Sequence, residues 1–131
     1  MRKVAPLVLI VSLLIAALAC SLGSNAPNSD IVGKYDLEGT NPDGTGYSGT
    51  VEIVNAGDGY DLTWTIDSGP QAQIETGHGT LDGQTLTALW QMADNSSSGT
   101  EQFTINSDGT LDGTWKIEGS EDEGQEVLTR Q

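Results

Sequence analysis

Aromatic side chains are the residues of this sequence best suited to hold a small molecule. They recur at alternate positions within short apolar stretches, which predicts that they share the inner face of their strands. The set comprises Tyr35, Tyr47, Tyr60, Trp64, Trp90, Phe103 and Trp115. Such rings can line a pocket for a sugar or a small apolar ligand, or they can fill the core of a small domain. The sequence leaves both interpretations open.

Aromatic residues near strand ends are the better candidates for ligand contact, because Tyr and Trp there keep a polar tip for hydrogen bonds. Tyr47 and Tyr60 each begin a predicted strand, and Trp90 lies near a strand end. We therefore predict a ligand-binding set of Tyr47, Tyr60, Trp64, Trp90 and Trp115.

Catalytic chemistry has little support in the sequence. His78 is the one histidine and Cys20 the one cysteine. We expect His78 on an inner face in a structural role, and no nucleophile elbow is present. We predict no catalytic residue and no enzyme activity. The alternative is a carboxylate-based hydrolase, for which 19 acidic residues offer many pairs but no assignment. Most of these acids are predicted to face outward or to lie in turns.

We predict no metal ion and no cofactor. A weak calcium site is the alternative at Asn106, Asp108 and Asp112, whose spacing partly matches a calcium-binding loop, although Thr104 stands where an acid is needed. The acidic segment 118–126 is a second alternative. Turn chemistry explains the first segment equally well, and a solvated hairpin loop explains the second.

Charge excludes one class of partner. The 131 residues carry a formal net charge of −14, and all 19 acidic residues follow Cys20. A surface of this sign repels phosphate backbones, so we expect no nucleic-acid partner. A single Cys also excludes a disulfide or zinc scaffold.

The segment from Ile31 onward predicts an all-β domain. Apolar residues alternate with polar ones, and Asp-Gly pairs separate the stretches at Asp43, Asp58, Asp82 and Asp108. Eight strands are expected, at residues 31–38, 47–53, 60–67, 72–78, 85–92, 103–105, 111–118 and 125–129. In the weak fourth strand we place Ile74, Thr76 and His78 inward. In the last strand, either Val127 or Leu128 faces inward.

Short connections favour antiparallel neighbours, so the predicted fold is an eight-stranded up-and-down barrel, with a two-sheet sandwich as the alternative. Mid-strand glycines at 33, 49 and 113 favour the strong coiling of a barrel. The segments Gly33-Lys34-Tyr35 and Gly113-Thr114-Trp115 resemble the Gly-x-Trp of small calycin-type barrels, the avidin and lipocalin group. The resemblance implies an architecture and no particular ligand.

The first 20 residues resemble the signal of a bacterial lipoprotein. Arg2 and Lys3 precede an apolar run at 4–19, and Ala16-Ala17-Leu18-Ala19-Cys20 is lipobox-like, with Ala17 where Leu is commonest. The resemblance implies cleavage before Cys20 and lipidation of its thiol. Ordinary signal cleavage and an uncleaved anchor remain alternatives.

Together these observations predict a signal-peptide helix at 1–19, a lipidated Cys20 with a tether to residue 30, and a barrel domain at 31–131. The expected protein is exported and held at the cell membrane or outer membrane by its lipid. Its expected function is non-catalytic, with a small ligand in or at the mouth of the barrel. A protein-interaction or structural module of the envelope, with a solid core, is the main alternative.

Overall fold

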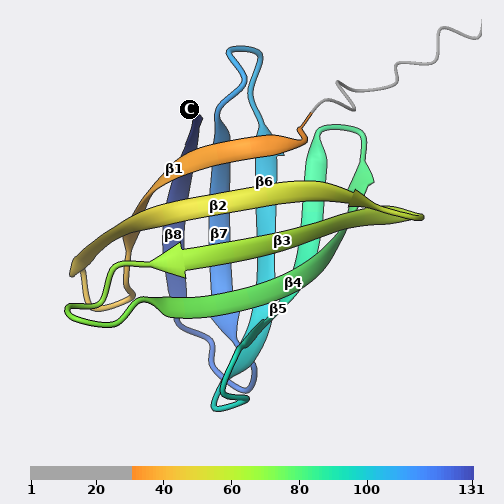
Figure 1. Ribbon diagram of the computed structural model, residues 1–131. Coiled ribbons are helices and arrows are strands. Elements are labelled where there is room, and N and C mark those ends of the chain that lie inside the picture. Colours follow the sequence, from red (N-terminus) through yellow and green to blue (C-terminus); the bar gives the residue numbers. More distant parts are fainter. Residues whose placement is uncertain (1–30) are drawn as a thin grey trace, which may run out of the picture.

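The barrel domain is seen in a computed structural model that describes residues 31–131 (Figure 1). It confirms an all-β, closed, eight-stranded antiparallel barrel. The predicted signal peptide, the lipidated Cys20 and the tether lie outside the described residues. The strands are β1 (Gly33–Thr40), β2 (Gly46–Ala56), β3 (Gly59–Ile66), β4 (Gln73–Asp82), β5 (Thr85–Met92), β6 (Ser98–Ile105), β7 (Leu111–Ile117) and β8 (Glu123–Arg130).

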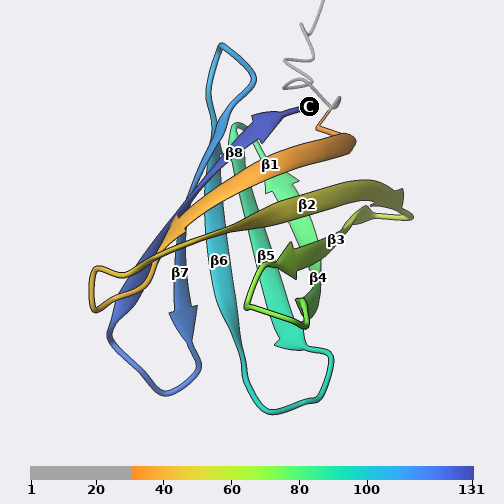
Figure 2. The same ribbon diagram turned by 60° about the vertical axis from the view of Figure 1, so that its left-hand side comes forward.

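Each strand pairs with the next along the chain, and β8 returns to β1. The closing pair joins Tyr35 to Arg130 and Leu37 to Leu128 in one antiparallel register. The sandwich alternative is therefore wrong, and closure leaves the sheet without an exposed edge. The front strands β2 to β4 cross the back strands β6 to β8 at a steep angle, as expected for a strongly coiled small barrel (Figures 1 and 2).

Several acidic residues serve the turns, as the sequence indicated. Asp43 and Asp108 each accept hydrogen bonds from the backbone N–H and the hydroxyl of a Thr two residues later. The Thr side-chain hydrogen bond is the main reason that the pKa of each carboxyl lies below its usual value. Asn106 of the predicted calcium-like loop donates to Thr110 and Asp112. These side chains are thus engaged within the turn.

One end of the barrel, here called the closed end, is filled by side chains. It carries the β2–β3, β4–β5 and β6–β7 turns, and both Ile31 and Arg130 lie there. The Tyr35 hydroxyl donates to the Ile31 carbonyl at 2.7 Å and accepts from Arg130 at 2.9 Å. The Arg130 guanidinium also lies 5.0 Å from the centre of the Tyr35 ring. The buried aliphatic residues Leu86, Ile105 and Leu111 complete this packing.

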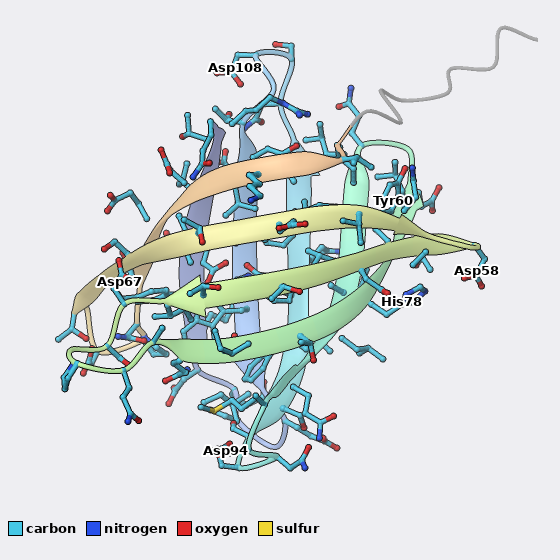
Figure 3. The ribbon with its side chains drawn as sticks, viewed as in Figure 1. Asp58, Tyr60, Asp67, His78, Asp94 and Asp108 are labelled. Carbon is cyan, nitrogen blue, oxygen red and sulfur yellow. The ribbon has the colours of Figure 1, made fainter. Side chains whose placement is uncertain are left out.

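The predicted inner face was wrong for β4. Gln73, Glu75 and Gly77 face inward, whereas Ile74 and His78 are exposed. His78 lies on the outer surface near Asp58 (Figure 3), and its Nδ1 is 2.9 Å from Asp61 on β3. In β8, Leu128 is the buried member of the pair that the sequence left open, and Val127 is exposed.

Glycines lie opposite several aromatic rings of the inner face. Tyr47 is paired with Gly39, Trp90 with Gly99, and Trp115 with Gly124 on the adjacent strand. A Cβ atom at any of these glycines would overlap the ring across from it. Each ring therefore lies along the barrel wall over a glycine, a known way of packing aromatic side chains in curved sheets.

Candidate functional site

The end opposite the closed end, here called the open end, contains a cavity of about 320 Å³. It carries the β1–β2, β3–β4, β5–β6 and β7–β8 loops, near the labelled Asp67 and Asp94 in Figure 3. Its walls include Tyr47, Trp90, Met92 and Trp115, and acidic side chains form the inner part. The strands that supply these residues are held in register by the closed end, so the site is built on rigid elements.

Two carboxyl groups lie side by side at the bottom of this cavity. Glu101 of β6 and Glu126 of β8 are each only 3% exposed. Glu126 Oε1 accepts from the Tyr47 hydroxyl at 2.8 Å, and its Oε2 accepts from Trp64 Nε1 at 3.1 Å. The Glu101 carboxyl supplies a third hydrogen bond to Glu126. Glu101 Oε1, in contrast, is buried with no hydrogen-bond partner among the described residues.

The surroundings of the two carboxyl groups shift their pKa values to different degrees. Burial raises the pKa of Glu101 well above its usual value, and the neighbouring Glu126 raises it further. Burial also raises the pKa of Glu126, but its three hydrogen-bond donors act in the opposite direction. The pKa of Glu126 nevertheless stays above its usual value, because burial outweighs these hydrogen bonds. Of the two carboxyls, Glu126 is therefore the first to ionise, and Glu101 keeps its proton to higher pH.

A third inward carboxyl belongs to β4. Glu75 is partly buried and accepts a hydrogen bond from Gln73 at 2.9 Å. Burial raises the pKa of Glu75, the Gln73 hydrogen bond lowers it, and Glu126 raises it. The cavity therefore combines several carboxyl groups whose environments disfavour their charged forms.

Hydrogen bonds and ring contacts hold the aromatic wall in place. Trp115 Nε1 donates to the Tyr47 hydroxyl at 2.8 Å, while that hydroxyl donates to Glu126. Burial, followed by the charge of Glu126, raises the pKa of Tyr47. Trp90 and Trp115 meet edge to face, with ring centres 6.3 Å apart and planes at 87°. The rings thus present fixed faces and edges to the cavity.

The structure brings together three of the five predicted ligand-binding residues. Tyr47, Trp90 and Trp115 line the cavity. Trp64 is fully buried and reaches the site only through its hydrogen bond to Glu126. Tyr60 lies at the closed end, beside Asp58 in Figure 3, because consecutive antiparallel strands begin at opposite ends of a barrel.

The inward acids were missed by sequence reasoning. Glu75, Glu101 and Glu126 face the interior, so the prediction that most acids face outward or lie in turns is wrong for these three. Alternation offered a signal for Glu101, which shares a register with Phe103 and Ile105. Glu126 does not belong to the solvated loop 118–126, because it precedes buried Leu128 by two positions.

Among residues 31–131, no group of three or more His, Cys, Asp or Glu is arranged to hold a metal ion. Over the same range, no helix has the length and hydrophobicity needed to cross a membrane. A larger hollow of about 1040 Å³ lies on the outer surface of β3 to β7. Leu89, which is 66% exposed, lines this outer groove together with Ile117 and His78.

Comparison with known proteins finds no protein-family model and no curated protein that matches the sequence. Solved structures do share its fold. A redesigned beta barrel (b11L5F_LGL) aligns with a TM-score of 0.70 and 15% identity, covering 77% of this chain and 91% of its own. The redesigned beta barrel mFAP1 bound to DFHBI aligns with a TM-score of 0.66 and 17% identity, with 76% and 94% covered.

A natural function is named in one further structure, the REP1-NXSQ fatty acid transporter. It aligns with a TM-score of 0.50 and 16% identity, covering 78% of this chain and 96% of its own. At these identities the likeness concerns the fold alone. This chain is thus a small eight-stranded barrel similar to designed barrels and to a fatty acid transporter.

Proposed function

We propose that this protein is a non-catalytic lipoprotein of the cell envelope whose barrel binds one small ligand in the open-end cavity. The observation that carries the binding proposal is the cavity itself, with its aromatic wall and a buried Glu101 oxygen that has no hydrogen-bond partner among the described residues. Apolar walls with a few placed polar groups are the usual composition of small-molecule sites.

Cavity size limits the ligand. A volume of about 320 Å³ lies at the lower end of the range for small-molecule pockets. It equals the share of liquid volume of about ten water molecules, at about 30 Å³ each. The similar barrels mFAP1 and the REP1-NXSQ protein support the proposal, since one holds DFHBI and the other is a fatty acid transporter.

The carboxyl pair argues against the hydrolase alternative. Glycosidase carboxyls are about 5–9.5 Å apart, with the scissile bond or a water between them. Here Glu101 and Glu126 are hydrogen-bonded to each other, and Glu126 is also bonded to Tyr47 and Trp64. The two carboxyls are thus bonded to each other and to the barrel wall at the bottom of the cavity, an arrangement that differs from two carboxyls placed on either side of a scissile bond.

The binding proposal can be tested with a panel of small compounds titrated into the full-length protein by isothermal calorimetry. We expect at least one compound to bind with a stoichiometry of about one, as a single cavity requires. Gly124→Ala should abolish that binding, because the new Cβ would force the Trp115 ring off the wall and into the cavity. Gly46→Ala is the matched control, since a Cβ there meets only a backbone oxygen at 3.8 Å.

The envelope location is proposed from the lipobox-like segment that ends at Cys20. Cells fed a clickable fatty acid should label the wild-type protein and leave Cys20→Ser unlabelled. If neither is labelled, the protein is not lipidated, and ordinary secretion or an uncleaved anchor replaces the lipoprotein proposal.

The outer groove favours one second candidate, a protein-interaction module. Exposed Leu89 gives this groove an apolar patch, and Ile117, which also lines the open-end cavity, lies where the groove and the cavity adjoin. Under this alternative a partner co-purifies with the wild type, and Leu89→Glu releases the partner while leaving compound binding in the cavity unchanged.

A further inference from the structure

We infer that the open-end cavity takes a small organic cation, such as a protonated amine, with aromatic rings around it and carboxyl groups beside it. The inference rests on the proposed function, because it names the chemical class of ligand for the same cavity. Three observations carry it: the carboxyl groups that several strands supply to the lining, the buried Glu101 oxygen, and the aromatic wall.

The lining of the cavity has one sign of charge. It contains four carboxyl groups, those of Asp67, Glu75, Glu101 and Glu126. None of its described residues is Lys, Arg or His. Two basic side chains of the barrel interact with other residues, away from the cavity. Lys116 forms an ion pair with Glu123 at 3.2 Å, and Arg130 lies over the ring of Tyr35 at the closed end. An anionic ligand would meet only like charge, and such juxtaposition is a strong barrier to a wrong partner.

The unpartnered oxygen lies against Gly113 of β7, with less than 1 Å² of accessible surface, so a ligand reaches it only if the Glu101 side chain turns toward the cavity. Only 3% of the surface of Glu101 is exposed. Its Oε1 accepts no hydrogen bond from the described residues. A buried acceptor without a partner destabilises the fold, because it has lost its hydrogen bonds to water. An ammonium group supplies only donors, three for a primary amine, whereas a carboxylate ligand supplies only acceptors. Donor-rich ligands therefore fit the bottom of the cavity.

The aromatic wall favours a cation over a neutral donor. Trp is the best ring for a cation–π contact, and the contact strengthens when it is shielded from water. Trp90 and Trp115 are in edge-to-face contact, with ring centres 6.3 Å apart, so a cation would lie over the ring faces that this contact leaves open to the cavity and not between the two rings. Tyr47 adds a third ring, held by its hydrogen bonds to Trp115 and Glu126.

Binding of a cation has a consequence for the proton of the carboxyl pair. The titratable groups that face this proton are Tyr47 of β2, Asp67 after β3, Glu75 of β4 and Glu126 of β8. None of them carries a positive charge. When an ammonium ion arrives, the Glu101 O–H bond breaks and the proton leaves to solvent, so that two carboxylates share the ligand's charge. At a pH where Glu101 is protonated, binding should release a proton, and affinity should fall as the pH is lowered.

Three probes of similar shape test the inference by calorimetry on the full-length protein: benzylammonium, benzyl alcohol and benzoate. We expect benzylammonium to bind roughly tenfold or more tightly than benzyl alcohol, and benzoate not to bind.

Titrations of benzylammonium in two buffers of different ionisation enthalpy should show proton release. Glu101→Gln should remove that release and weaken benzylammonium binding roughly tenfold. Glu38→Gln, an equal charge change on the exposed face of β1, should change neither quantity.

The failures of the two proposals can be told apart. If benzyl alcohol or benzoate binds as tightly as benzylammonium, or if cation binding releases no proton, the cation inference is overturned and the ligand-binding function stands. If no probe and no panel compound binds, both are overturned. Should Glu101→Gln fail to fold, Glu75→Gln removes another carboxyl of the same cavity and should also weaken benzylammonium binding.

Discussion

The two ends of this barrel are built from the same eight strands but are filled differently. At the closed end, fully buried Leu86 and Leu111 meet the Tyr35–Arg130 pair, and this packing fills the interior. At the open end, Tyr47 and Trp115 lie along the wall over Gly39 and Gly124. Both regions are rich in large side chains, and among residues 31–131 the cavity of about 320 Å³ lies at the second.

The difference lies in how the large side chains are placed at each end. At the closed end, Leu111 is paired with Leu128, and Phe103 is fully buried although it lies over Gly113. At the open end, the rings of Tyr47 and Trp115 lie flat over glycines and line the cavity. The closed end thus supplies packing energy, while the open end keeps a preorganised site at some cost in stability, as functional sites often do.

The largest expected effect is a difference in the free energy of unfolding between substitutions at the two ends. Leu111→Ala should lower the free energy of unfolding by about 2–5 kcal/mol, because it creates a cavity in tight packing. Met92→Ala removes a side chain of similar volume from the wall of an existing cavity, and should cost less than about 1 kcal/mol. Urea unfolding measures both. Equal losses would mean that the open end is packed like the closed end.

A smaller effect is expected when a glycine of the open end gains a side chain. Gly124→Ala should lower the free energy of unfolding by about 1–3 kcal/mol, since Trp115 must move and its hydrogen bond to Tyr47 is lost. Gly46→Ala should change it by less than about 0.5 kcal/mol. An unchanged Trp115 indole signal in Gly124→Ala would contradict this account of the wall.

The pH dependence of stability offers a third comparison. Because the folded pKa of Glu101 lies above its unfolded value, the folded state binds the extra proton. Stability from this group is present below the unfolded pKa and is lost as the pH rises through the folded pKa. Glu101→Gln should therefore lose less stability than wild type between about pH 4.5 and neutrality. Urea unfolding at several pH values measures this difference, and parallel pH profiles would place the Glu101 proton elsewhere.

The smallest effect concerns His78, which lies outside the barrel. The Asp61 hydrogen bond, helped by the charges of Asp61 and Asp58, raises the pKa of the imidazole above 6.5. Asp61→Asn should lower that pKa in an NMR titration. It should leave ligand binding unchanged, because neither residue lines the cavity. A change in ligand affinity would show coupling between the outer face and the site.

Local pattern was enough to predict the barrel but not its acidic interior. Alternation and Asp-Gly turns indicated eight strands, and aromatic residues at alternate positions indicated the inner face. For β4 the pattern misled, because Ile74 is outward and more apolar than inward Gln73 and Glu75. A strand whose inner face is polar cannot be assigned from hydrophobicity alone.

Burial of a carboxyl depends on partners that the sequence does not reveal. Glu126 is tolerated inside because Tyr47, 79 residues away, and Trp64, 62 residues away, donate hydrogen bonds to it. Register also decides which strand ends meet: Tyr47 and Tyr60 both begin strands, yet they lie at opposite ends of the barrel. In an up-and-down barrel, consecutive strands run in opposite directions, so the first residues of β2 and β3 must lie at opposite ends.

The central claim is that the open end binds a ligand while the closed end is solid. NMR of the three Trp indole N–H signals during titration with a bound compound tests it most directly. We predict saturable shifts of the Trp90 and Trp115 signals, with Trp64 responding less because it touches the site only through Glu126. Shifts confined to the outer groove around Leu89, with all three indole signals unchanged, would contradict the account.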